Sequence, residues 1–461
     1  MAAEPTSESA STDPAHPGTT AGAGTKVNVL LIGGGSREHA LAWAMARSAR
    51  LGRLYVTHPQ NPGLAALGRP IDVPFTIGEL YRLEQFCDAH EIGLVVIGPE
   101  GPLAEGFADR LSTPTRKVFG PSQGAARLES DKAWCKTFLH EAHVPTADGR
   151  SFTDYESAIA YVQSRNEPPV IKASGLAAGK GVIVPETIAQ ACDAVKMMMV
   201  DRAFGKAGEK VVIEERLTGR EVSVFAITDG RNIHVLPPCQ DHKRLLDNDK
   251  GPNTGGMGAL CPSDAIDDQT MSVIEREILV PTIDALKRDG IDYRGVLYAG
   301  LMLTHSGPKV IEYNVRFGDP ECQTLLVSLK SDIIEIMLAT STRQLGKVEL
   351  AWNARPVVCV VLASKGYPSS PQKGDPIIGI EEAAAMEGVE IFFAGAARQD
   401  QSDPSSPIVT AGGRVLSVVA MGESWEQARK RAYKAAHAID FAGKQMRHDI
   451  GRGMGVQIPM P

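Results

Sequence analysis

Buried strands and amphipathic helices alternate over about one hundred residues from Val27 onward. Val27 to Ile32 is apolar except at Asn28, as is typical of a strand covered on both faces. Further strands are expected at 53–57, 94–97 and 117–119, and helices at about 36–50, 79–90 and after residue 102. This alternation predicts a doubly wound parallel sheet, whose ligands lie beyond the carboxyl ends of its strands. Gly33–Gly35 and Gly98–Glu100 stand at two such ends.

The pattern becomes mixed after residue 120. We expect helices over 122–145, 264–288 and 331–343, and β-rich stretches over 211–236 and 296–313. Asp229-Gly230 is a hairpin turn signal in the first of these stretches. Strands at 357–362 and 415–420 precede a helix that begins at Ser424, where Gln427 would complete a capping box. The chain is therefore expected to hold several domains of α/β and α+β type.

Composition and charge narrow the class of protein. The 461 residues carry a net charge of −7, which argues against sequence-independent binding of nucleic acid. No apolar run is long enough to span a bilayer, so no membrane partner is expected. Seven cysteines lie scattered without a CxxC pair, which favours reduced thiols and a cytoplasmic location. Residues 1–25 contain no large apolar side chain and are expected to be a disordered tail rather than a signal peptide.

A glycine-rich loop follows the apolar strand that starts at Pro169. Gly175, Gly179 and Gly181 would let backbone N–H groups approach an anion, and Lys172 and Lys180 add positive charge. The segment nearly fits a phosphate-binding loop, but Gly181 stands where a hydroxyl would help to hold Mg²⁺. The loop therefore indicates a nucleoside triphosphate whose metal is bound elsewhere. A glycine-rich hairpin with surface lysines is the alternative.

A polar strand end near residue 312 offers the metal ligands. Glu312 and Asn314 alternate along one strand and so face the same side. Two oxygen donors suit Mg²⁺, which takes its other ligands from water and phosphate. If the strand continues, Arg316 lies on the same face and could hold a phosphoryl group or a carboxylate. An ordinary strand with a polar end is the alternative.

A polar segment rich in glycine runs from Gln240 to Ala259. It contains Gln-Asp-His-Lys-Arg at 240–244 and Gly-Pro-Asn-Thr-Gly-Gly-Met-Gly-Ala at 251–259. We predict a long loop that folds over an anionic substrate, with its backbone N–H groups exposed. A solvated surface loop is the alternative.

These segments together carry a resemblance. The chain resembles the glycinamide ribonucleotide synthetase (phosphoribosylamine–glycine ligase) family of the ATP-grasp superfamily, from residue 27 to about residue 451. Besides the two motifs just given, the resemblance rests on these segments: Gly-Gly-Gly-Ser-Arg-Glu-His-Ala at 33–40, Gly-Pro-Glu-Gly-Pro-Leu at 98–103, Gly-Leu-Ala-Ala-Gly-Lys-Gly-Val at 175–182 and Arg-Phe-Gly-Asp-Pro-Glu at 316–321.

The resemblance implies an architecture. It has an N-terminal doubly wound parallel sheet like that of biotin carboxylases, a central ATP-grasp domain with a lid, and a small mixed C-terminal domain. The ranges expected from the sequence are a tail at 1–25, domains at 26–127, 128–351 and 352–452, a lid at about 146–218, and a second tail at 453–461. The chain is expected to be a monomer.

The resemblance also implies a reaction. ATP, glycine and 5-phosphoribosylamine would give ADP, phosphate and N-(5-phosphoribosyl)glycinamide, through glycyl phosphate. Mg²⁺ or Mn²⁺ would be held by Glu312 and Asn314. The catalytic residues implied are Lys172, Asp241 and Arg316. The ATP contacts implied are Lys132, Lys172, Gly175, Gly179, Lys180, Gly181, Glu214, Glu215, Leu217 and Glu221. Of these, the linker from Glu214 to Leu217 would contact the adenine through its backbone, and Glu221 would lie near the ribose. The substrate contacts implied are Gly35, Asp241, Lys243, Thr254, Gly255, Gly256, Met257 and Arg316.

Some positions depart from the family pattern, and other functions are open. The family usually has Asp at Ser174 and Ala at Gly101, and its Pro-Gly-Asn appears here as the longer segment 58–63. A nicotinamide or flavin enzyme is one alternative, although Glu38 replaces the third glycine of that fingerprint. A different ATP-grasp ligase and a non-catalytic nucleotide-binding protein are the others.

Overall fold

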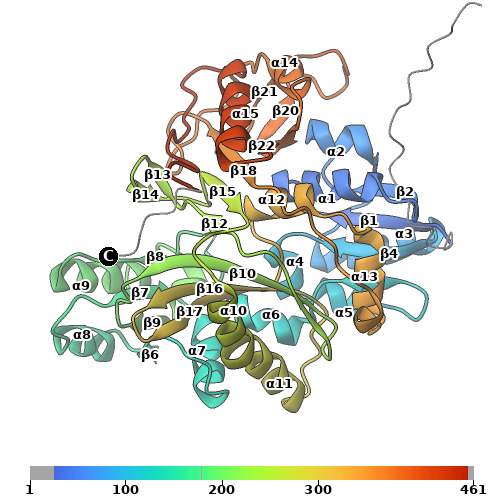
Figure 1. The fold of residues 1–461 in the computed structure, drawn as a ribbon. Helices are drawn as coiled ribbons and strands as arrows, with labels where there is room; N and C mark the ends of the chain where they lie inside the picture. Colours follow the sequence, from blue (N-terminus) through green and yellow to red (C-terminus); the bar gives the residue numbers. More distant parts are fainter. Residues whose placement is uncertain (1–24, 178, 455–461) are drawn as a thin grey trace, which may run out of the picture.

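A computed structural model describes residues 25–454 except residue 178. The two tails that we predicted at 1–25 and 453–461 lie almost wholly outside the described residues. Figure 1 shows the N-terminal segment on one side, the C-terminal segment above it, and a smaller unit with α8 and α9 on the other side. No helix in the described part of the chain is both long and apolar enough to cross a membrane.

The N-terminal segment is the parallel sheet that the alternating pattern predicted. Its strand order is β3-β2-β1-β4-β5, and every neighbouring pair is parallel. Successive strands are added on one side of β1 up to β3 and on its other side from β4 onward. The turns at Gly33 and Gly98 therefore lie at the switch point where such sheets bind ligands. The elements are β1 (Val27–Ile32), α1 (Ser36–Ala46), β2 (Leu51–Val56), α2 (Pro62–Leu67), β3 (Arg69–Pro70), η1 (Ile77–Glu79), α3 (Leu80–Ala89), β4 (Ile92–Ile97), α4 (Glu100–Ala104), α5 (Phe107–Leu111) and β5 (Lys117–Phe119).

Two antiparallel sheets form the middle of the chain. The first has the order β6-β9-β7-β8 and packs against α8 and α9 through its own apolar cluster. The second has the order β11-β10-β16-β17. The elements of the first unit are β6 (Gly149–Phe152), α8 (Tyr155–Gln163), β7 (Val170–Ala173), β8 (Val182–Ile183), α9 (Ile188–Met199), η2 (Gly205–Gly208) and β9 (Val211–Glu214). The second sheet holds β10 (Arg220–Thr228), β11 (Ile233–Val235), β16 (Gly295–Thr304) and β17 (Gly307–Asn314).

Helices flank these sheets, and two predicted helices are interrupted. They are α6 (Gln123–Ser130), α7 (Lys132–Glu141), α10 (Asp268–Ile274), the π-helical turn η3 (Glu275–Leu279), α11 (Val280–Arg288), α12 (Glu321–Ser328), α13 (Ile333–Ser341) and η4 (Leu345–Lys347). The expected helix at 122–145 breaks at Asp131, whose carboxylate caps α7 by accepting a hydrogen bond from Trp134 N. The expected helix at 264–288 starts late and contains the π turn before Pro281, which has no N–H for a regular helix. Helix α12 was not predicted.

The prediction of one long loop at 240–259 is wrong in part, because this segment contains strands. These are β12 (Gln240–Asp241), β13 (Arg244–Leu246), β14 (Lys250–Asn253) and β15 (Gly258–Cys261). Strands β13 and β14 form a hairpin of their own. Strand β15 is buried because it pairs with β18 over Gly258 to Cys261. Periodicity could not show this pairing, since the partner strand lies about one hundred residues further along the chain.

The C-terminal segment thus shares its sheet with the middle of the chain. The order is β12-β15-β18-β22-β19, with α15 packed against β18 and β22. The remaining elements are β18 (Val357–Ala363), α14 (Ile380–Ala384), β19 (Val389–Phe393), β20 (Ala396–Arg398), β21 (Ile408–Thr410), β22 (Arg414–Met421) and α15 (Trp425–Ala438). Ser424 caps α15 by accepting from Gln427 N, but the Gln427 side chain accepts from Glu423 N rather than from Ser424 N.

Candidate active site

The strand that leads into the predicted phosphate loop contacts the predicted metal strand. Lys172 lies on β7, and its ammonium donates a hydrogen bond to the carbonyl oxygen of Ile311 on β17, at 2.9 Å. Glu312 is the next residue of that strand. The sheet β6-β9-β7-β8 (the lid sheet) and the sheet β11-β10-β16-β17 (the central sheet) therefore approach each other where the candidate ligands of ATP lie.

Helix α7 adds two lysines to this place. Lys132 is its first residue, and its ammonium lies 3.4 Å from the carbonyl oxygen of Gly175. The Lys132 backbone N–H donates to Ser174 O, and the Ser174 hydroxyl donates to Asp131, so β7 is tied to the start of α7. Lys136 lies one turn further on and contacts Glu214 at 2.9 Å. Lys136 was not predicted, although its spacing of four residues from Lys132 placed both on one helix face.

The glycine loop itself is only partly available to a ligand. Gly175 lies so close to Ala207 that a Cβ would approach its Cα to 2.9 Å, and its N–H donates to Ala207 O. Gly175 is therefore needed for packing. Gly179 has a φ of +75°, which suits glycine, and Lys180 is exposed. Gly181 packs against Ala177.

Strand β9 ends at Glu214, the first residue of the linker whose backbone we expect to contact the adenine. Its carboxylate is buried between Lys172 at 2.7 Å and Lys136 at 2.9 Å. Burial tends to raise the pKa of Glu214, but the two lysines outweigh it and lower the pKa. Glu215 pairs with Lys309 at 3.1 Å and exchanges two hydrogen bonds with Asp148. Leu217 follows in the same linker and is half-buried.

Glu312 is surrounded by cations. Burial alone would raise its pKa, yet Lys243, Lys172 and Lys132 outweigh this effect and lower the pKa. The ammonium of Lys243 lies 3.8 Å from the Glu312 carboxylate and also contacts Glu221 of β10. With Lys136 included, four lysines lie among the three carboxylates of Glu214, Glu221 and Glu312, so one positive charge is left over, which suits a polyphosphate.

Glu312 and Asn314 fit the role of magnesium ligands by their chemistry. Both stand on β17 two residues apart, where side chains share one face of the sheet. The described residues contain no group of three or more His, Cys, Asp or Glu side chains that could hold a metal alone. A metal here would need phosphate oxygens to complete its ligands, as Mg²⁺ does in ATP sites.

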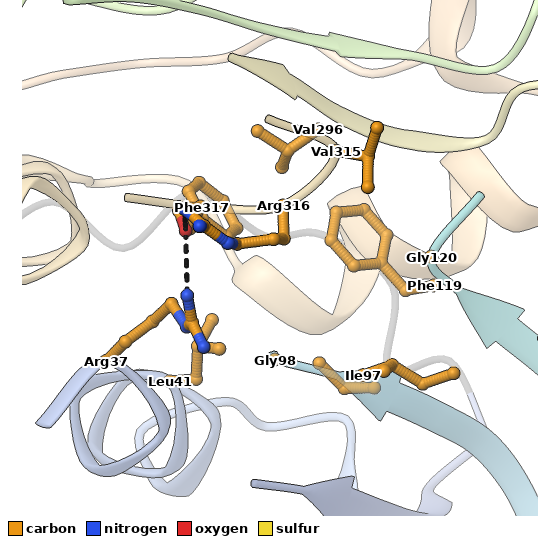
Figure 2. A pocket seen from close by; sticks show the side chains of 11 residues that line it. Arg37, Leu41, Ile97, Gly98, Phe119, Gly120, Val296, Val315, Arg316 and Phe317 are labelled. Carbon is orange, nitrogen blue, oxygen red and sulfur yellow. Dashed lines mark hydrogen bonds between the residues drawn. The ribbon is translucent and has the colours of Figure 1, made fainter. Parts of the chain in front are cut away.

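Arg316 lies beside these residues but is already paired. Strand β17 ends at Asn314, so Arg316 follows the strand instead of continuing it. Its guanidinium contacts Glu129 at 2.7 Å, Glu100 at 3.2 Å and Asn314 Oδ1 at 3.2 Å. Figure 2 shows Arg316 lining a small cavity together with Arg37, which donates to Phe317 O at 3.2 Å. A phosphoryl group would have to compete with two carboxylates for Arg316.

Asp241 is a buried carboxylate with an unused acceptor. Its Oδ1 has no hydrogen-bond partner among the described residues. Burial, together with the charge of Glu321, raises the pKa of Asp241 well above its usual range, although Lys243 opposes the shift. A carboxyl group with a raised pKa and an open acceptor suits contact with an amine or transfer of a proton.

The glycine segment beside Asp241 does not expose its N–H groups. Those of Thr254 and Met257 donate to backbone carbonyls, that of Gly256 to the Thr254 hydroxyl, and that of Gly255 to the Tyr367 hydroxyl at 2.9 Å. The Met257 side chain is fully buried. This expectation was wrong because the segment folds into its own turn and into β15.

The N-terminal segment, the middle of the chain and the C-terminal segment meet near the residues expected to contact the substrates. This junction includes residues that the sequence did not reveal. Gly35 N donates to Glu38 at 2.7 Å, and the next residue, Ser36, donates to Asp319 at 3.1 Å. Arg414 of β22 donates to the Asp319 carbonyl oxygen at 2.6 Å and also contacts Gly255 O. Arg414 carried no sequence signal, since it reaches the site from the far end of the chain.

The fold and the site define an ATP-grasp protein, in which lysines lie between two antiparallel sheets beside the strand that carries Glu312 and Asn314. Phosphoribosylglycinamide synthetase models match the chain as N domain at 27–129, ATP-grasp domain at 130–322 and C domain at 357–453. The chain belongs to the phosphoribosylglycinamide synthetase family. ATP binding follows from the ATP-grasp fold.

Named relatives agree. A phosphoribosylamine–glycine ligase of Rhodopirellula baltica is 47% identical over 92% of this chain and 97% of its own length. That of Haemophilus influenzae is 43% identical over 92% and 98%. The chicken trifunctional purine biosynthetic protein adenosine-3 is 48% identical over 92% of this chain, which spans 42% of that longer protein.

A solved structure shows the same arrangement. The phosphoribosylamine–glycine ligase of Thermotoga maritima has a TM-score of 0.79 at 34% identity, over 92% of this chain and all of the other. The biotin carboxylase domain of Hydrogenobacter thermophilus 2-oxoglutarate carboxylase has a TM-score of 0.68 at 15% identity, over 92% of each chain, which shows the fold alone.

Proposed function

We propose that this protein joins glycine to 5-phosphoribosylamine at the expense of ATP, giving N-(5-phosphoribosyl)glycinamide, ADP and phosphate. The observation that carries the proposal is the contact between Lys172 and Ile311, because it gathers three lysines around Glu312. A carboxylate such as that of glycine is a poor acyl donor and must be activated by phosphorylation. Phosphoryl transfer depends on positioning and on neutralising charge, which these lysines supply.

The residues take the following roles in the proposed route. Lys132 and Lys172 hold the triphosphate while the glycine carboxylate attacks its γ-phosphorus, which gives glycyl phosphate and ADP. When bound by Glu312 and Asn314, Mg²⁺ or Mn²⁺ would supply further positive charge to the phosphate oxygens. The amine of phosphoribosylamine then displaces phosphate from glycyl phosphate. The amine loses a proton in this step, and the Oδ1 of Asp241, which has no partner among the described residues, is placed to accept it.

The proposal extends to the state of the protein. We take the functional form to be a monomer, because one chain supplies every residue of the candidate active site. We place it in the cytoplasm, because the seven cysteines are free and six of them are buried.

Phosphate release from ATP tests the function, with glycine and freshly generated phosphoribosylamine omitted in turn. We expect sustained release only when both are present. Release that needs neither, or that needs a different amino acid, would overturn the proposal. Chromatography of the product against N-(5-phosphoribosyl)glycinamide would establish the bond that forms.

A further inference from the structure

A buried charge triad lies behind the candidate ATP site. The carboxylate of Glu214 bridges the ammonium groups of Lys136 and Lys172, at 2.9 and 2.7 Å. All three side chains are no more than 6% exposed. Charged groups are buried in this way only when each has partners, so the three act as one unit.

Lys136 has no capacity left for a ligand. Its ammonium donates to Thr146 Oγ1 at 2.8 Å, to Ala147 O at 2.9 Å and to Glu214 Oε1 at 2.9 Å. An ammonium group has three N–H bonds, and these contacts use all of them. Lys136 therefore serves the protein itself and does not contact ATP.

Lys172 differs in this respect. The described residues account for two of its three N–H bonds, through Ile311 O and Glu214 Oε2. One N–H bond is left for a phosphate oxygen. The positive charge of Lys172 attracts a phosphate only as far as Glu214 does not neutralise it.

We infer that Lys136 is a positioning residue for ATP, which shares the Glu214 carboxylate so that Lys172 keeps its charge for the triphosphate. Two ammonium groups and one carboxylate leave a net charge of +1 in the triad. Without Lys136 the triad would be neutral, and Glu214 would hold Lys172 alone. This inference rests on the proposed function only in taking ATP as the ligand.

Lys136 also fixes the hinge of the lid. Thr146 and Ala147 lead into β6, where the chain enters the lid, and Glu214 ends β9, where it leaves. The Lys136 ammonium therefore contacts both the segment that enters the lid and the segment that leaves it. Thr146 in turn donates to Val310 O at 2.8 Å, which places the hinge against β17. The charge of Lys172 and the base of the lid thus depend on the same residue.

Calorimetric titration with Mg·ATP in the absence of glycine tests the inference on the full chain. For Lys136→Met we expect ATP binding to weaken by about tenfold or more, the scale of a charge-assisted hydrogen bond. The KM for ATP should rise by a similar factor, while kcat at saturating ATP falls by less than about threefold. Adding Glu214→Gln to Lys136→Met removes the carboxylate that Lys136 neutralised. The ATP contact expected of Glu214 is made by its backbone, which Glu214→Gln keeps, so the double variant should bind ATP within about threefold of the wild type.

Thr146→Val is the matched control, because it removes one contact of Lys136 without changing any charge. We expect a lower melting temperature but ATP affinity within about threefold of the wild type. The inference is overturned if Lys136→Met binds ATP normally, if the double variant stays as weak as the single, or if Thr146→Val weakens binding equally. If the single variant does not fold, the double variant decides. Wild-type protein that binds ATP but does not use glycine would refute the proposed function and leave this test intact.

Discussion

Replacing Glu312 by Ala separates the metal-binding role of this residue from any role in stability. The backbone of Glu312 pairs with Gly300 in the central sheet, and this pairing does not need the side chain. At 3.8 Å from Lys243, the carboxylate contributes an attraction of about 4 kcal/mol at an effective dielectric constant of about 20. Both side chains are about 30% exposed, so solvent screening and desolvation reduce the net loss of stability to about 1 kcal/mol. The variant should fold.

Turnover should respond far more strongly. A metal that neutralises phosphate charge contributes several kcal/mol to the transition state, so losing one of two protein ligands should lower kcat by about a hundredfold or more. The assay is ADP release at a series of Mg²⁺ concentrations, together with thermal unfolding. We expect the Mg²⁺ requirement to rise in Glu312→Ala.

Glu335→Ala provides the control for this experiment. Glu335 is a partly exposed carboxylate that pairs with Arg50 at 3.3 Å, away from the lysine cluster. Its loss should cost a similar small amount of stability and leave turnover unchanged. If Glu312→Ala keeps more than about one tenth of wild-type turnover at limiting Mg²⁺, the assignment of Glu312 as a metal ligand is wrong.

Three further predictions concern ATP affinity, pH and backbone strain. Lys172→Met should raise the Kd for ATP about tenfold or more, and an unchanged Kd in calorimetry would count against a phosphate contact. His39 is buried, accepts a hydrogen bond from Phe393 N at 2.9 Å, and has its pKa lowered by burial from about 6.5 to about 4. Because the unfolded chain binds this proton more readily, stability should fall by up to about 3 kcal/mol as pH drops from about 6.5 to 4. His39→Asn keeps an acceptor and should flatten the pH dependence of the urea midpoint, whereas an unaltered slope would exclude His39 as its source. Gly379→Ala should destabilise the protein by about 2 kcal/mol or more, because φ is +80° and the added Cβ would lie 2.0 Å from Ala438 O. Gly374→Ala has a positive φ but no atom within 4 Å, so its urea midpoint should fall less, and equal losses would contradict the steric explanation.

Much of the N-terminal segment followed from local pattern, and local pattern also predicted where the candidate ATP site lies. The strand Val27–Ile32 is apolar on both faces because helices cover both faces of a parallel sheet, and its observed bounds match the expected ones. Lys172 and the strand that carries Glu312 were both predicted as parts of one site, and a hydrogen bond joins Lys172 to Ile311 of that strand. Each of these motifs consists of a few neighbouring residues, so it can be recognised without knowledge of the fold.

The same local reasoning was wrong where distant segments decide the structure. The N–H groups of Gly255 and Gly256 were expected to face a substrate, but Tyr367 and Thr254 accept their hydrogen bonds. The pairing of the Glu214 carboxylate with two lysines was not expected from the sequence. Lys136 lies 78 residues before Glu214, and no periodic pattern links residues at that separation.

By itself, then, the sequence determined the alternating sheet and predicted a phosphate loop and two oxygen ligands, because each depends on neighbouring residues and on the periods of strands and helices. Tertiary structure alone decided which charges pair, which backbone donors are used, and that β15 belongs to the C-terminal sheet. Those outcomes depend on contacts between residues far apart in the chain. Once buried, each charge and each N–H group needs a partner, and the fold decides which residue that partner is.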